Sequence, residues 1–184
     1  MNQELIINST PNEVVIALLN DKRLVELHRE KNNSRFSVGD IYLGKAKKVM
    51  TGLNAAFVDV GYEKDAFLHY LDLGPHALSL MKYVVQTQNG KQNVSNLMYF
   101  KSEPEIKKDG KINQIIKSGQ NLLVQVAKEP ISAKGPRITT EISLAGRYLV
   151  LIPFSDKISV SSKIRKFEEK NRLKELMQKI KPKN

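Results

Sequence analysis

Short apolar runs separated by turn-forming residues fill the first 30 positions of the chain. The runs lie at residues 5–7, 14–19 and 24–27, and the segments between them are rich in Asn, Ser, Pro and Asp. This pattern is typical of strands joined by tight turns. We therefore expect a β-meander as the first unit, residues 1–35, with a polar linker near its end. A lone sheet of this size is marginally stable unless something covers one of its faces.

Apolar and polar residues then alternate strictly in several segments of residues 36–140, which we expect to form the second unit. Gly44 lies inside the first of these segments, which indicates a bend or a close backbone approach. The alternation predicts five short strands, at residues 41–50, 55–60, 65–69, 122–128 and 137–144. Five short strands with a bent first strand predict a five-stranded OB-fold barrel, so the expected fold class is mainly β with some α.

About fifty residues separate the third and fourth predicted strands. This segment, residues 70–119, is rich in Gln, Asn and charged side chains, and it predicts an insertion with some flexibility and no assigned role. The third expected unit covers residues 141–184. It begins with an apolar strand over residues 144–152 and ends in a helix over residues 163–180, capped by Ser161-Ser162. The apolar stripe of that helix comprises Ile164, Phe167, Leu173, Leu176 and Ile180.

The charge of the chain favours a polyanionic partner. Thirty Lys and Arg residues against nineteen Asp and Glu residues give a net charge of +11. Residues 1–35 hold equal numbers of basic and acidic side chains, so the whole excess lies in the barrel unit and the C-terminal unit. A well-solvated basic surface without a specific ligand is the alternative explanation of the charge.

Several classes of protein are made improbable by what the chain lacks. It has no cysteine, which excludes a disulfide framework and a thiolate metal site. It shows no signal peptide, and no run approaches the roughly 18 apolar residues of a membrane helix. We expect a soluble cytoplasmic protein with no membrane contact.

Strand alternation places an aromatic group on the polar face of the predicted barrel. In residues 55–60 the small aliphatic side chains point one way and Phe57 points the other, and in residues 65–69 Phe67 and His69 share that second direction. Bases of single-stranded nucleic acid stack on such rings for roughly 1–3 kcal/mol each. A basic rim that tracks the phosphates could come from nearby lysines, namely Lys45, Lys47, Lys48, Lys128 and Lys134.

A structural explanation of the same residues stays open at this point. Phe57 and Phe67 could pack beneath the long insertion and bind nothing. His69, taken alone, could be an ordinary surface or core histidine. Asp59 and Asp65 lie at ordinary strand and turn positions, so we expect solvated acids rather than metal ligands there.

Longer blocks of the sequence carry a family resemblance. Gly44-Lys45, the run AAFVDVG at residues 55–61 and AFLH at residues 66–69 resemble an S1 RNA-binding domain. The blocks IYLGKAKKV, LNAAFVDVGYEKDAFL and KGPRITTEISLAGRYLVLIP resemble, more specifically, the N-terminal portion of bacterial ribonuclease E/G family enzymes. The resemblance implies that Phe57, Phe67 and Lys134 contact single-stranded RNA.

The same resemblance implies a pocket for a 5′-monophosphate, lined by Gly146 and Val150. The family pattern departs at one position, because a serine stands directly before Lys163 where the family usually has an arginine. Lys163 or Arg165 could substitute. A lysine is a point charge, however, and does not reproduce the bidentate contact of an arginine.

The family's remaining features imply a parent enzyme larger than this chain. Its cutting site uses two metal-binding aspartates on a later subdomain, with Mg²⁺ as the expected cofactor, and a cysteine pair binds a zinc ion that links protomers into a homo-oligomer. The meander resembles the start of the family's ribonuclease-H-like subdomain. We expect this chain to bind single-stranded RNA without cleaving it, and to hold no metal or cofactor itself.

Two other functions fit the pattern and stay open at this point. The barrel could be a stand-alone S1 module of a translation or RNA-chaperone factor. It could also be a protein-interaction OB domain without any role in RNA binding, because the fold alone does not fix the function.

Overall fold

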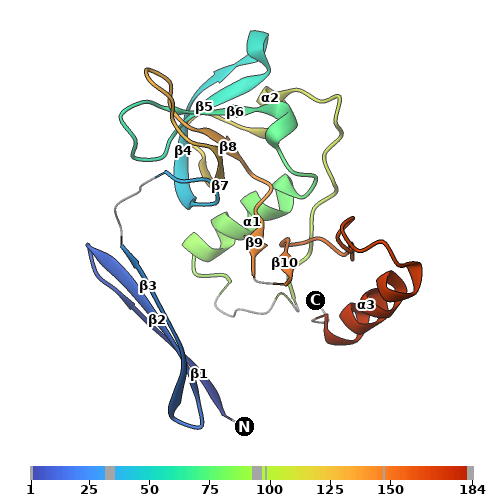
Figure 1. Ribbon diagram of the computed structural model, residues 1–184. Coiled ribbons are helices and arrows are strands. Elements are labelled where there is room, and N and C mark those ends of the chain that lie inside the picture. The colour runs from blue at the N-terminus through green and yellow to red at the C-terminus, as the bar shows by residue number, and fades with distance from the viewer. Residues whose placement is uncertain (1, 32–35, 93–96, 98, 147, 182–184) are drawn as a thin grey trace.

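The computed structural model describes residues 2–31, 36–92, 97, 99–146 and 148–181 (Figure 1). The described chain is mainly β with three α-helices, which confirms the expected fold class. A β-meander, a closed barrel and a C-terminal hairpin and helix follow one another along the chain. No helix in the described part of the chain is both long and apolar enough to cross a membrane.

The barrel has five strands in the order β4-β5-β6-β8-β7. All of its neighbouring strands pair antiparallel except β6 and β8, which are parallel. Its interior is filled by alternating aliphatic residues such as Val58, Leu68, Val124 and Ile138, all fully buried. The strands are β4 (Ile41–Met50), β5 (Ala55–Asp59), β6 (Ala66–His69), β7 (Asn121–Lys128) and β8 (Arg137–Thr139).

Gly44 in β4 allows the close backbone approach that the sequence predicts. A Cβ atom at this position would lie 2.7 Å from Cγ1 of Val58 and 3.0 Å from the carbonyl oxygen of Asp59. Any larger residue would therefore push β4 and β5 apart. Further along β4 the register with β5 shifts between Ala46 and Lys48, so Lys47 lies at a β-bulge.

The segment between β6 and β7 is an integral part of the barrel core. It holds η2 (Tyr70–Asp72), α1 (Ala77–Gln88) and α2 (Ile112–Ile115). Helix α1 buries Leu80, Met81 and Val84, while Ile112 and Ile116 lie fully within the core. The expectation of a flexible insertion is therefore wrong for most of the described part, because its apolar residues close one side of the barrel. Residues 93–96 and 98 of that segment lie outside the described residues.

Two hydrogen-bonding side chains, the half-buried Asn54 and the buried Tyr70, hold this segment in place. The side chain of Asn54 donates to the carbonyl of Gly110 and accepts from the backbone N–H of Ile112, at 3.1 and 2.7 Å. The hydroxyl of Tyr70 donates to the carbonyl of Lys107. A side chain at Gly110 would collide with that hydroxyl, so glycine is required there for packing.

The N-terminal meander forms a three-stranded antiparallel sheet in the order β1-β2-β3. Its strands are β1 (Gln3–Ser9), β2 (Glu13–Asn20) and β3 (Arg23–Lys31), and the sheet projects away from the barrel (Figure 1). Leu5, Ile7, Leu24 and Leu27 are all more than half exposed. Most of the predicted linker, residues 32–34, lies outside the described residues, and the boundary at residue 35 stays a prediction.

The C-terminal region differs from the sequence prediction at two strands. β8 ends at Thr139 rather than at residue 144, because the backbone N–H of Thr140 turns away to donate to the carbonyl of Asp72. The predicted strand 144–152 is a hairpin of β9 (Leu144–Ala145) and β10 (Val150–Leu151), closed by Gly146 N–H donating to Leu149. Gly146 interrupts the apolar run, and this turn signal is present in the sequence.

The terminal helix α3 (Phe167–Ile180) begins four residues later than predicted. Ser161 does not cap it, because its hydroxyl accepts from the backbone N–H of Lys163 in a separate turn. Lys166 precedes the helix without a side-chain cap, and Glu168 and Glu169 in the first turn complement the helix dipole instead. The predicted apolar stripe is largely unburied, and Phe167 is 75% exposed.

Candidate nucleic-acid interface

Phe57, Phe67 and His69 lie together on the outward face of the barrel. Phe57 of β5 and Phe67 of β6 are direct cross-strand partners, with ring centroids 5.9 Å apart and ring planes at 65°. The His69 ring lies 6.4 Å from Phe67 and is tilted by 32°. Both Phe rings are half-buried. Strand alternation predicts this grouping, and the register explains it, because partners across strands share one face.

His69 has a fixed tautomer in its neutral form. Its Nδ1 accepts a hydrogen bond of 3.1 Å from the backbone N–H of Leu71. Nδ1 therefore carries the lone pair and Nε2 carries the proton. The imidazole adds one N–H donor beside the two Phe rings.

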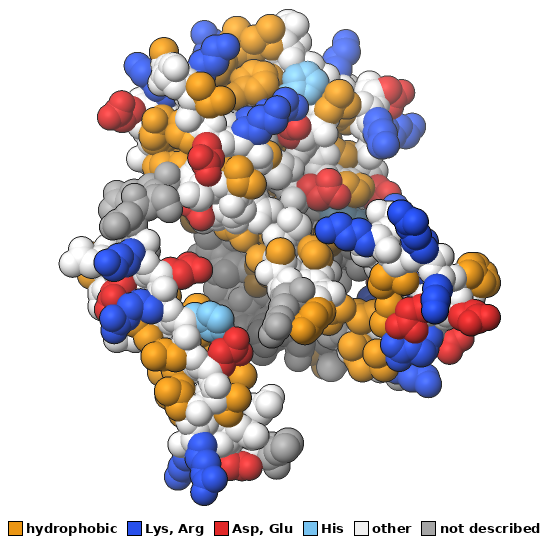
Figure 2. All heavy atoms as spheres, viewed as in Figure 1, with side chains coloured by type: hydrophobic (Ala, Val, Ile, Leu, Met, Phe, Trp, Pro, Cys, Tyr) orange, Lys and Arg blue, Asp and Glu red, His pale blue; other side chains and the backbone are white. Residues whose placement is uncertain are grey.

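Three cationic residues lie in the same register row as the two Phe rings. Lys48 of β4 pairs with Phe57, Phe67 pairs with Arg137 of β8, and Arg137 pairs with Lys128 of β7. The three cationic side chains are exposed. At the barrel end of the molecule, Figure 2 shows apolar side chains and a histidine among Lys and Arg side chains. We call Lys48, Phe57, Phe67, Arg137 and Lys128 the cross-barrel row.

The alternative in which the Phe rings serve only to pack the long segment is not supported by their contacts. Helix α1 packs against β7, and Tyr83 of that helix meets Phe100 and Phe154 rather than the barrel aromatics. Among the residues that the structure describes, no Lys or Arg side chain lies over the ring of Phe57 or Phe67. Both rings are half-buried rather than fully covered, so part of each ring is exposed to solvent.

Lys47 and Lys45 differ from the lysines of the row. Lys47 Nζ lies 2.8 Å from Asp65 and 3.1 Å from Asp59, which neutralise its charge locally. These hydrogen bonds, first to Asp65 and then to Asp59, raise the pKa of Lys47. The pKa of Asp59 lies below its usual value, mainly because the backbone N–H of Gly61 donates to it and then because of Lys47. Lys45 is exposed and pairs in register with Asp59.

Lys134 lies in a tight loop that is fastened to the start of β6. Its backbone N–H donates to Ile131 at 3.0 Å, and the loop continues through Gly135 to Pro136, whose carbonyl accepts from Phe67 N–H at 2.9 Å. A Cβ atom at Gly135 would lie 2.3 Å from the carbonyl oxygen of Asp65. Only glycine permits this approach, which brings the loop carrying Lys134 against the strand that carries Phe67.

Arg137 is the member of this face that the sequence argument missed. Its Nε and Nη2 donate to the two carboxylate oxygens of Asp72, both at 2.9 Å. Its position directly before the buried Ile138 marks it as outward-facing, and this signal is present in the sequence. Its pairing with Phe67 could not be predicted, because that parallel pair joins segments 70 residues apart in the chain.

Comparison with known proteins identifies the family of this chain. The model of the Ribonuclease E/G family matches residues 143–184. Ribonuclease G of Haemophilus influenzae is 39% identical over 175 residues, which cover 95% of this chain and 32% of that protein. The chain belongs to the ribonuclease E/G family. Ribonuclease G of Escherichia coli strain K12 is 36% identical over 177 residues, 96% of this chain and 32% of that protein.

This ribonuclease E/G family chain is also similar to a relative that is not named ribonuclease G. A ribonuclease E/G-like protein of Porphyra purpurea is 39% identical over 151 residues, 82% of this chain and 24% of that protein. The chain therefore spans about a third or less of the length of the curated relatives that it matches.

The predicted 5′-phosphate residues of this family member occupy an exposed hairpin and a separate turn further along the chain. Gly146 and Val150 lie in the β9–β10 hairpin, and Val150 pairs with Ala145. A Cβ atom at Gly146 would lie 3.2 Å from the carbonyl of Leu149. Lys163 is exposed beyond the hairpin, and within the described part of the chain no hydrogen bond or ion pair joins it to Gly146 or Val150. Their role as a phosphate pocket stays a prediction.

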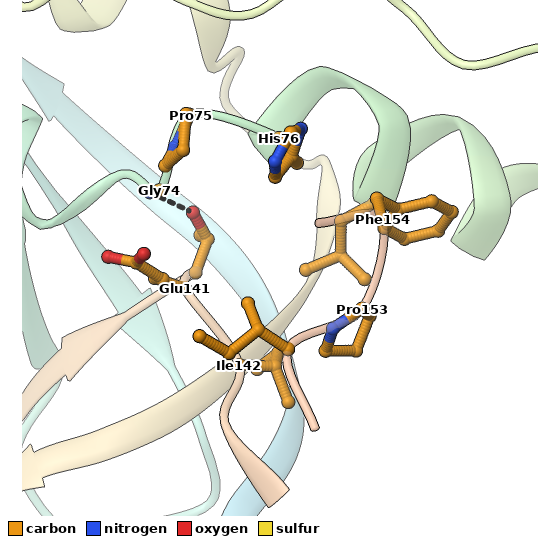
Figure 3. Close-up of a pocket in the computed structure, with 10 residues that line it drawn as sticks. Gly74, Pro75, His76, Glu141, Ile142, Pro153 and Phe154 are labelled. Carbon is orange, nitrogen blue, oxygen red and sulfur yellow. Dashed lines mark hydrogen bonds between the residues drawn. The ribbon is translucent and has the colours of Figure 1, made fainter. Parts of the chain in front are cut away.

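A separate pocket lies between the start of α1 and the segment that follows β8 (Figure 3). The backbone N–H of Gly74 donates to the Thr140 hydroxyl at 3.3 Å at its edge. His76 lies 3.9 Å from Glu105 there. The lining is mainly apolar, formed by Gly74, Pro75, His76, Leu80, Thr140, Glu141, Ile142, Ile152, Pro153 and Phe154. Over the described residues, no group of three His, Cys, Asp or Glu side chains is placed to hold a metal ion.

Proposed function

We propose that this chain is the single-stranded RNA-binding part of a ribonuclease E/G-type endoribonuclease that acts in RNA processing and decay. The cross-barrel row carries the proposal. Its two half-buried Phe rings are flanked on both sides by cationic side chains in the same register. Bases splayed from a single strand stack on aromatic side chains, and cations beside the rings follow the phosphates.

The positive charges on the barrel face would guide the RNA along a path that crosses the strands. Lys48 lies at one end of the row and Lys128 at the other, with Lys134 on the adjoining loop. Lys45 lies on the neighbouring row beside Asp59. Lys47 contributes least to this phosphate track, because Asp59 and Asp65 already hold its ammonium group. His69 offers its Nε2–H to a base or a sugar next to Phe67.

Cleavage would belong to other parts of the parent enzyme, for which Mg²⁺ is the expected cofactor. Asp59 and Asp65 do not fit a magnesium site, because the Lys47 ammonium lies between them, where a cation would bind. We therefore propose that this chain binds RNA without cutting it. Incubation of a labelled RNA with the pure chain and Mg²⁺ should leave the RNA intact, and reproducible cleavage would contradict the proposal.

The 5′-phosphate pocket is the second part of the proposal. Gly146 and Val150 would line it, and Lys163 would supply the cation in place of the family's arginine. RNAs that differ only in a 5′-phosphate or a 5′-hydroxyl should then bind with different affinities, and Lys163→Ala should remove the difference. Equal affinities for the wild-type chain would show that this chain does not sense the 5′ end. The parent enzyme is further proposed to be cytoplasmic and homo-oligomeric.

The experiment that tests RNA binding is a titration of a fluorescently labelled single-stranded RNA of about ten nucleotides, followed by anisotropy. Phe57→Ala and Phe67→Ala should each weaken binding by about fivefold to a hundredfold, since each stacked base is worth roughly 1–3 kcal/mol. Phe167→Ala is the matched control, because it makes the same chemical change at an exposed Phe on α3. Absence of salt-sensitive binding by the wild-type chain would refute the proposal.

A further inference from the structure

Arg137 belongs to the cross-barrel row, and hydrogen bonds hold its planar guanidinium in place, so it is not a free cation. Phe67 pairs with Arg137 in register, and the backbone N–H of Phe67 donates to the residue just before Arg137. The backbone therefore fixes Arg137 beside the Phe67 ring. Its side chain is 43% exposed, which leaves part of the guanidinium open to a ligand.

Asp72 fixes the plane of that guanidinium. The two carboxylate oxygens accept from Nε and Nη2 at 2.9 Å each, and this bidentate pair raises the pKa of Arg137. Asp72 is itself held, since its carbonyl accepts from the Thr139 hydroxyl at 2.6 Å and from Thr140 N–H at 3.2 Å. The pair uses two of the five N–H donors of the guanidinium and leaves its flat face uncovered by Asp72.

Charge and shape then point to different roles for Arg137 and for the lysines of the row. Asp72 lies in contact with the cation and cancels most of its field at a distance, whereas no such carboxylate contact holds Lys48 or Lys128 within the described residues. A compensated guanidinium is a weak partner for a phosphate. It remains a planar group on which a base can stack.

We propose that Arg137 is a third stacking position of the RNA face, next to Phe57 and Phe67, and that Asp72 is the positioning residue that orients it. The ligand is one base of a single-stranded RNA, so the inference rests on the proposed function. Its distinguishing property is that Arg137 contributes to affinity without contributing a phosphate contact. A purely structural role, in which the pair only fastens η2 to β8, would leave RNA affinity unaffected in a folded variant.

The test measures RNA affinity against salt concentration for Arg137→Ala, Arg137→Lys and Lys128→Ala. Arg137→Ala should weaken binding by about fivefold to a hundredfold and leave the salt dependence unchanged. Arg137→Lys should fail to restore affinity, because an ammonium has no plane. Lys128→Ala is the matched control, and it should reduce the slope of log K against log salt by about 0.7, the value for one phosphate contact on a single strand.

Asp72→Asn provides a second variant of nearly the same shape, and thermal unfolding is measured for every variant. It should weaken RNA binding less than Arg137→Ala, because the guanidinium stays but is no longer held in its plane. If Arg137→Lys restores binding and Arg137→Ala lowers the salt slope, Arg137 is a phosphate contact and the inference is wrong. If folded Arg137→Ala and Asp72→Asn bind like the wild type while Phe57→Ala weakens binding, this inference fails and the proposed function survives.

Discussion

Two regions of this chain expose large apolar side chains, and they differ in what surrounds those side chains. The N-terminal sheet exposes aliphatic residues on both faces, with Leu5 and Ile7 on one and Ile6 and Leu27 on the other. Its charged residues pair within the sheet, as in the contact between Arg29 and Glu13 at 3.4 Å. The barrel face instead places two aromatic rings between exposed cations.

Exposed apolar area alone therefore does not identify a ligand. Branched aliphatic side chains pack well against other aliphatic side chains, and a lone three-stranded sheet needs such a cover to be stable. Flat rings stack with flat bases, and adjacent cations favour a polyanion. The whole excess positive charge also lies outside residues 1–35. The sheet lacks the rings and the surplus cations on which the proposed RNA binding of the barrel face depends.

The largest expected effect comes from making the barrel face resemble the sheet. Phe57→Leu with Phe67→Leu keeps the face apolar but removes both rings. RNA affinity should fall by more than tenfold, because stacking is lost at two positions, each worth roughly 1–3 kcal/mol. Phe57→Tyr with Phe67→Tyr keeps the rings and should bind within a few-fold of the wild type. Equal binding by the Leu and Tyr pairs would show that the rings are not stacking platforms.

A smaller effect is expected from a change in the loop that carries Lys134. Gly135→Ala places a methyl group against the backbone of Asp65, and the loop must shift. The free energy of unfolding, measured by urea denaturation, should fall by about 1–3 kcal/mol. Gly52→Ala is the control, because a Cβ there meets open space. If the two variants are equally stable, the close fit of the loop against β6 is not important for stability.

Two lysines of the barrel face should differ in how much each contributes to the salt dependence of RNA binding. Lys134→Ala should reduce the slope of log K against log salt by about 0.7, as expected for one lost phosphate contact. Lys47→Ala should reduce it by less than half of that, because Asp59 and Asp65 already compensate this charge. The comparison uses RNA titrations at several salt concentrations. A larger change for Lys47→Ala would mean that RNA displaces the two carboxylates.

The smallest effect concerns Asp59 and pH. Its pKa is lowered in the folded chain, so the stability it contributes is present above its unfolded pKa of about 4 and is lost as the pH falls through the lower folded value. The difference in melting temperature between the wild type and Asp59→Asn should therefore shrink between pH 5 and the strongly acidic range. A difference that stays constant over that range would contradict the role given to Gly61 N–H and Lys47.

Local patterns predicted the elements of this fold better than its long-range pairings. The strands and the shared direction of Phe57, Phe67 and His69 follow from alternation, which depends only on neighbouring residues. The pairing of Arg137 with Phe67 and the β-bulge at Lys47 depend on register between distant segments. Neither can be read from a local pattern. Both decide which cations of the face are free to meet a phosphate.

The long segment before β7 was misjudged for a related reason. Its many polar residues suggested an insertion, yet its sparse apolar residues are gathered by folding into one side of the core. Ile112 and Ile116 lie outside the barrel strands, in a segment with many polar residues, yet both are fully buried in the core. The hairpin at residues 144–152 was missed for a different reason, because Gly146 interrupts its apolar run and this local turn signal was not used. Tertiary contacts decide the structure only of the long segment.

If single-stranded RNA lies on the cross-barrel row, NMR should locate it there. Backbone amide shifts of the 184-residue chain are followed during titration with a ten-nucleotide single-stranded RNA. The largest shifts should fall on Phe57, Phe67, Arg137 and the loop around Lys134, with little change in β1–β3. Shifts concentrated on β1–β3 or α3, with β5 and β6 unchanged, would contradict RNA binding on this row.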